Sequence, residues 1–119
     1  MKRIATVVAA AAAIAALAAG PANAAPVKVI GTVGPGETIG LTIGGKKVKR
    51  LKVGVAYRFV IRDRSSEHDF RLSGPRTSKT LTSVGFTGTK SVVLKLKKGA
   101  YQFFCMPHSD DMHGAFTVA

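Results

Sequence analysis

Regular alternation of apolar and polar residues is the main pattern of the chain after residue 24. It is clearest in Val55–Asp63, where Tyr57, Phe59 and Ile61 fall on one side and arginines on the other. Alternation with a period of two predicts a β-strand that buries one face. The same pattern in Tyr101–Cys105 predicts another strand of this kind.

Turns that contain glycine divide the rest of this region into short segments. We expect strands at Val27–Val33, Thr38–Ile43, Val55–Asp63, His68–Leu72, Thr80–Thr87, Ser91–Leu96, Tyr101–Cys105 and Ala115–Val118, with Lys46–Lys52 as a further extended segment. We expect Thr80–Thr87 to pair with Ser91–Leu96 through a turn at Gly88. No helix of useful length is expected after residue 24. This spacing predicts an all-β sandwich or barrel of seven or eight strands.

The first 24 residues have a different pattern. Lys2 and Arg3 precede an apolar run, Ile4–Ala19, and the small residues Ala22-Asn23-Ala24 follow it. This is the layout of a cleavable secretory signal peptide. An uncleaved membrane anchor is the alternative, although the run is short for a span and consists mostly of alanine. We therefore expect a signal peptide at residues 1–24 and one exported domain at residues 25–119, in the periplasm or outside the cell.

The candidate chemistry is concentrated in YQFFCMPHSDDMHGAF, residues 101–116, which contains the single cysteine of the chain. Exported proteins normally use cysteines in disulfide pairs, so an unpaired thiol calls for an explanation. Cys105 and His108 stand three residues apart across a proline, and Met112 follows four residues later. His68, upstream on another short strand, is a fourth candidate. Two imidazoles, one thiolate and one thioether are the donors of a blue-copper site.

Each of these residues also has an interpretation without a metal. Cys105 can be a small buried core residue, and His68 and His108 can be ordinary strand-edge or loop histidines. Met112 can be core packing. Its neighbour His113 competes with it as a ligand, because adjacent residues in extended chain point to opposite sides and only one of them can face the site.

The stretch YQFFCMPHSDDMHGAFTV resembles the copper-binding end of the cupredoxins, the family of plastocyanin-like and azurin-like proteins. HDF at His68–Phe70 resembles the upstream ligand motif of that family. The resemblance implies a Greek-key β-sandwich with one type 1 copper ion held by His68, Cys105, His108 and Met112. The loop length is a hybrid, with plastocyanin-like spacing from cysteine to histidine and azurin-like spacing from histidine to methionine. Asp69 stands where many relatives carry asparagine, and a carboxylate there would favour the oxidised metal.

We expect a one-electron carrier rather than an enzyme. Copper oxidases and nitrite reductases need further histidine-built centres, and His113 alone remains after the mononuclear site is assembled. Structural zinc is disfavoured because zinc rarely takes a thioether. A copper chaperone with the same ligands is the alternative function, and a metal-free β-sandwich interaction module is the second alternative.

The net charge of the exported domain indicates which partners it attracts. Residues 25–119 keep all six acidic residues and all lysines and arginines except Lys2 and Arg3, so their net charge is about +10. A basic domain attracts acidic redox partner proteins and anionic membrane or cell-envelope surfaces. Nucleic acid is not expected, because the chain is exported and the basic run Lys46–Lys52 contains no aromatic residue on which bases could stack. We expect a monomer.

Overall fold

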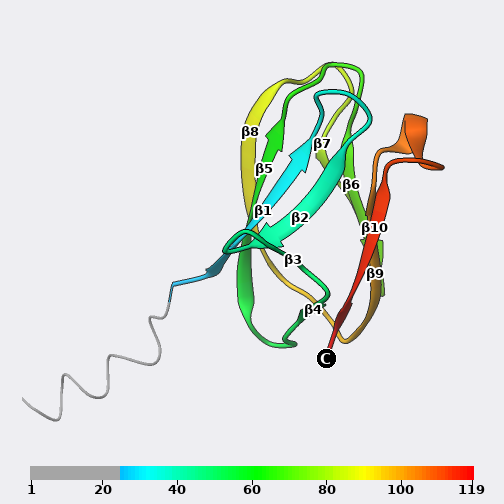
Figure 1. Ribbon diagram of the computed structural model, residues 1–119. Coiled ribbons are helices and arrows are strands. Elements are labelled where there is room, and N and C mark those ends of the chain that lie inside the picture. Colours follow the sequence, from blue (N-terminus) through cyan, green and yellow to red (C-terminus); the bar gives the residue numbers. More distant parts are fainter. Residues whose placement is uncertain (1–24) are drawn as a thin grey trace, which may run out of the picture.

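The computed structural model describes residues 25–119, which form a sandwich of two five-stranded sheets (Figure 1). The first sheet has the order β3-β2-β1-β5-β8 and contains β1 (Val27–Val33), β2 (Ile39–Ile43), β3 (Lys46–Lys47), β5 (Ala56–Asp63) and β8 (Gly88–Lys95). The second has the order β4-β10-β9-β6-β7 and contains β4 (Arg50–Leu51), β6 (Phe70–Gly74), β7 (Thr77–Thr82), β9 (Gly99–Phe104) and β10 (His113–Val118).

The predicted all-β sandwich is confirmed. Eight of the ten strands have five or more residues, whereas β3 and β4 have two each. Both sheets are mixed, since β1 runs parallel to β5 and β10 runs parallel to β4. The described part of the chain contains no α-helix, only the short 3-10 helix η2 (Met106–His108). Accordingly, none of its helices has the length and apolar character that a membrane span requires. The predicted signal peptide lies outside the described residues.

Alternation along the strands builds the core between the sheets. Tyr57, Phe59 and Ile61 of β5 are all buried, whereas Arg58 and Arg62 on the other face of the strand are exposed. In the second sheet, two aromatic pairs stack across neighbouring strands. The rings of Phe70 and Phe103 lie 5.7 Å apart, and those of Tyr101 and Phe116 lie 5.3 Å apart. Stacking and apolar burial together therefore fix β6, β9 and β10 against one another.

The predicted pairing of the segments Thr80–Thr87 and Ser91–Leu96 is wrong. The strand β7 ends at Thr82 and pairs with β6, whereas β8 starts at Gly88 and pairs with β5 in the other sheet. The residues between them cross from one sheet to the other. A two-residue period shows that a segment is extended, but it carries no information on which strand becomes its neighbour.

Four loops meet at one end of the sandwich, in the upper part of Figure 1: β1–β2, β5–β6, β7–β8 and β9–β10. We call this the histidine end, because two of these loops carry His68 and His108. The turns β2–β3, β4–β5, β6–β7 and β8–β9 join the strands at their opposite ends, and of these β4–β5 and β8–β9 lie nearest the C-terminal residue.

Candidate metal centre

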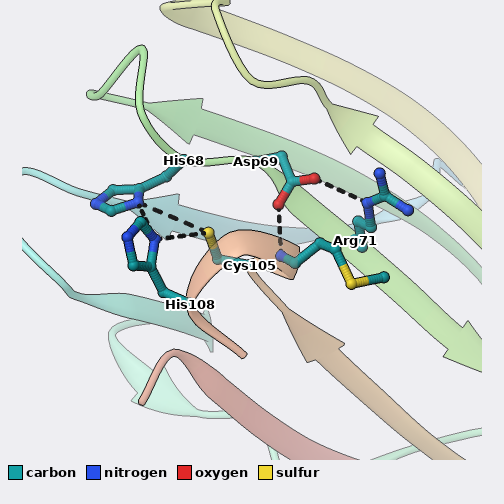
Figure 2. A network of polar contacts seen from close by, with 6 residues as sticks. His68, Asp69, Arg71, Cys105 and His108 are labelled. Carbon is teal, nitrogen blue, oxygen red and sulfur yellow. Dashed lines mark hydrogen bonds and ion pairs between the residues drawn. The ribbon is translucent and has the colours of Figure 1, made fainter. Parts of the chain in front are cut away.

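Three of the predicted ligands converge at the histidine end (Figure 2). His68 lies near the end of the β5–β6 loop, Cys105 directly precedes η2, and His108 is the last residue of η2. The Cys105 sulfur lies 3.6 Å from Nδ1 of His68 and 3.6 Å from Nδ1 of His108, and the two Nδ1 atoms are 3.1 Å apart. Residues separated by 37 positions along the chain thus present three electron-pair donors to one point.

The size of this triangle fits a metal ion. A point equidistant from its three corners lies about 2 Å from each donor atom, close to the metal–imidazole bond length of about 2.0–2.1 Å. The donor set is two imidazole nitrogens and one soft sulfur, which is the trigonal arrangement of blue-copper centres. The three residues fit a single type 1 copper ion.

A backbone contact orients the His68 ring. Its Nε2–H donates to the carbonyl oxygen of Gly36 in the β1–β2 loop, at 2.8 Å. This hydrogen bond places the proton of the neutral imidazole on Nε2 and leaves the lone pair of Nδ1 directed toward Cys105 and His108. Metal-binding histidines commonly have such a partner on the second ring nitrogen, and it fixes both tautomer and orientation.

The loop that carries the other ligands is closed by its own hydrogen bonds. The N–H of Cys105 donates to the carbonyl of Met112 at 3.0 Å, and the N–H of Met112 donates to the carbonyl of His108 at 2.8 Å. Pro107 lies in the first turn of η2, where its missing N–H costs no helical bond. The loop therefore holds Cys105 and His108 in position without help from a ligand.

The structure separates the two candidates for a fourth ligand. The Met112 side chain is completely buried. His113 is exposed, and its Nδ1–H donates to the carbonyl of Ser109 at 2.8 Å, which engages that nitrogen at the surface of the loop. His113 is therefore held at the surface, whereas Met112 belongs to the same buried core cluster as Cys105.

Asp69 connects the two ligand segments (Figure 2). Its carboxylate is almost completely buried, and Oδ1 accepts a hydrogen bond from the N–H of Met106 at 2.8 Å. The other oxygen, Oδ2, accepts from Nε of Arg71 at 2.8 Å. A buried carboxylate needs such partners, because desolvation without them is costly. Asp69 thus attaches the residue after Cys105 to the residue after His68.

Burial raises the pKa of the Cys105 thiol, and the nearby charge of Asp69 acts in the same direction. Backbone N–H groups of Asp69 and His108 act against this effect. A cation between the three donors would reverse the balance, because positive charge stabilises the thiolate. The site is thus built so that the sulfur ionises when a metal binds.

Two supporting groups were not found from the sequence. The Gly36 carbonyl has no sequence signal, since every residue carries one, although the positive φ of 71° at this residue is a backbone conformation that glycine adopts readily. The ion pair of Asp69 with Arg71 was also missed. The available signal was an acidic and a basic residue two positions apart at the start of a strand.

Solved structures align with most of this chain. Rusticyanin, described as a copper protein, aligns with a TM-score of 0.59 at 12% identity, over 82% of this chain and 80% of its own. Rusticyanin from Thiobacillus ferrooxidans gives 0.58 at 16%, over 82% and 79%. Reduced auracyanin from the photosynthetic bacterium Roseiflexus castenholzii gives 0.55 at 16%, over 81% and 99%. No family model matches the sequence, and a search of curated protein sequences finds no match.

Rusticyanin and auracyanin are cupredoxins. This chain has a cupredoxin-like fold. At these identities the likeness concerns the fold alone, so the chemistry of this cupredoxin-like domain depends on its own residues. The convergence of His68, Cys105 and His108 is an observation independent of the fold comparison, and it indicates a metal site.

Proposed function

We propose that this protein is an exported one-electron carrier that holds one copper ion through His68, Cys105 and His108, with Met112 as a weak axial ligand. The convergence of two imidazoles and one thiol on one point of a cupredoxin-like fold is the observation that supports it. Copper in such a site exchanges one electron between Cu(I) and Cu(II).

The surrounding residues supply rigidity. The hydrogen bonds of His68 to Gly36 and of Met106 to Asp69 hold the donors on both sides of the site. Phe70 follows His68 by two residues and Phe103 precedes Cys105 by two, and the stack of their rings joins β6 to β9. Ligands that are fixed before an electron arrives need little rearrangement afterwards, and small rearrangement favours fast transfer.

His108 offers the route for the electron. Cys105 and His68 are buried, whereas His108 is half-buried and reaches the protein surface. We propose that a redox partner docks over this ring. The exposed acidic residues in the neighbouring loops, Glu67, Asp110 and Asp111, do not favour an acidic partner at this end, so the acidic redox partner expected from net charge remains a prediction.

The test is to add Cu(II) to the purified domain and record its visible spectrum. We expect an intense thiolate-to-copper absorption band, which Cys105→Ala abolishes. Met112→Leu should shift the band and keep it, whereas His113→Ala should leave it unchanged. If His113→Ala shifts the band and Met112→Leu does not, the axial assignment is wrong. If the unsubstituted protein stays colourless with Cu(II), the copper proposal fails.

A copper chaperone would use the same ligands. Burial of Cys105 and His68 favours retention of the metal, since an acceptor protein cannot reach either donor directly. We expect the copper to remain bound through repeated cycles of reduction and oxidation in the presence of a competing chelator. Transfer of copper to the chelator in every reduced phase would support the chaperone instead.

A further inference from the structure

Acidic side chains are confined to one end of the sandwich, where exposed basic residues such as Arg62, Arg64 and Lys90 also lie. All six acidic residues of the chain lie in the loops of the histidine end or at strand ends beside them: Glu37, Asp63, Glu67, Asp69, Asp110 and Asp111. Asp63 and Asp69 are buried, and the other four are exposed. The acidic groups at the surface therefore surround the candidate metal centre.

Within residues 25–119, every charged side chain at the opposite end is basic. Each of its turns has at least one exposed cation at or beside it: Lys46 at β2–β3, Lys52 at β4–β5, Arg76 at β6–β7, and Lys97 and Lys98 at β8–β9. Lys28, Lys47, Arg50 and Lys95 lie on the adjoining strand ends and are also exposed. We call this surface the basic end.

Two valines are exposed at the basic end. Val53 follows Lys52 in the β4–β5 turn and is 50% exposed, and Val27 at the start of β1 is 41% exposed. Apolar side chains at the tip of a cationic surface are typical of proteins that rest on a lipid interface, where the cations meet phosphate groups and the apolar groups enter the boundary layer. A soluble polyanion would make use of the charges but not of the valines.

We propose that the basic end docks on an anionic phospholipid membrane, with Val53 at the contact and the histidine end facing away from it. Each lysine or arginine near such a surface adds to the attraction, and the acidic loops at the other end are repelled by the same surface. The orientation leaves His108 open to a soluble redox partner.

The chain contains no tryptophan, so one introduced tryptophan reports on one position. Val53→Trp places it at the basic end, and Val84→Trp places it at a valine of the histidine end that is equally exposed, at 52%. Residues 25–119 contain the complete core from Val29 to Val118, so this unit is produced and used without metal. Vesicles of phosphatidylcholine mixed with phosphatidylglycerol should shift the emission of Val53→Trp to shorter wavelength and leave that of Val84→Trp unchanged.

Binding itself is measured by co-sedimentation with the same vesicles. Lys52→Gln, Lys97→Gln and Lys98→Gln together should weaken binding by at least about tenfold, since each cation near an anionic surface contributes about fivefold. The control combines Arg62→Gln, Arg64→Gln and Lys90→Gln at or near the histidine end, which lowers the net charge equally. It should bind almost as tightly as the unsubstituted protein.

Three results would overturn the proposal. The first is equal weakening by both triple variants, which would show that net charge alone matters. The second is an emission shift for Val84→Trp instead of Val53→Trp. The third is binding to dextran sulfate without binding to the mixed vesicles, which would assign the basic end to a soluble polyanion. Because no step uses copper, these results are independent of the electron-carrier proposal.

Discussion

Asp69 shows how one side chain supports the candidate site without touching the metal position. Its two oxygens have different tasks, since Oδ1 holds the N–H of Met106 and Oδ2 holds Arg71. The sequence singled out this residue because many cupredoxins have asparagine there. The structure shows a role that asparagine and aspartate can both fill at this position: each has a side-chain oxygen that can accept the hydrogen bond from the N–H of Met106.

Replacing Asp69 separates these two tasks. Asp69→Asn can keep the acceptor for Met106 and loses the ion pair with Arg71, which is 39% exposed and therefore partly screened by solvent. We expect a loss of about 1–2 kcal/mol in the free energy of unfolding of the metal-free protein. Asp69→Ala also leaves the Met106 N–H without a partner and should cost about 1–3 kcal/mol more.

Urea unfolding of both variants measures the difference. Arg71→Gln is the complementary variant: it leaves the buried Asp69 carboxylate charged without its cation and should therefore cost more stability than Asp69→Asn. Equal stability of the alanine and asparagine variants would mean that the bond to Met106 contributes nothing to the loop.

At the scale of elements, the packing of neighbouring strands depends on glycine, which has no side chain, at positions of close approach. Gly74 closes β6 directly over the ring of Tyr101, and a Cβ added there would overlap that ring. Tyr101 cannot move aside, since it is buried, stacked on Phe116 and bonded through its hydroxyl to the carbonyl of Lys97. The close approach of β6 to β9 requires glycine at this position.

Gly74→Ala should therefore destabilise the sandwich by about 1–3 kcal/mol, as expected for an overpacked core. Gly40→Ala in β2 is the matched control, because a Cβ there meets no atom within 4 Å and its backbone angle is not in the positive range. Thermal unfolding of the two variants should give a lowered midpoint for Gly74→Ala only. A similar midpoint for both would show that β6 can shift away from Tyr101.

At the scale of the whole molecule, the candidate metal centre joins loops that the chain places far apart. His68 belongs to the connection from the first sheet to the second, and Cys105 and His108 belong to the connection between β9 and β10. A metal held by all three would bind the folded state and have no comparable site in the unfolded chain. Such binding is linked to stability.

Excess Cu(I) should therefore raise the unfolding temperature of the unsubstituted protein. A concentration of about a thousand times the dissociation constant adds about 4 kcal/mol, which for a domain of this size is a shift of about 15–30 °C. Cys105→Ser should show little of this shift, whereas His113→Ala should retain it. Scanning calorimetry with and without Cu(I) decides the matter, and an unchanged midpoint for the unsubstituted protein would contradict the three-ligand site.

The sequence by itself determined most of the strands and the residues that can bind a metal, although the predicted strand Thr80–Thr87 is in fact β7, which ends at Thr82, and a loop. Alternation around Phe59 and the turn residues are local signals, and Cys105 and His108 are neighbours in the chain, so their proximity needed only one turn. Only the tertiary structure decided that His68 lies beside them, that β7 and β8 belong to different sheets, and that the Gly36 carbonyl orients the His68 ring. These are contacts between distant segments, and they are set by the packing of the two sheets, which no short stretch of sequence encodes.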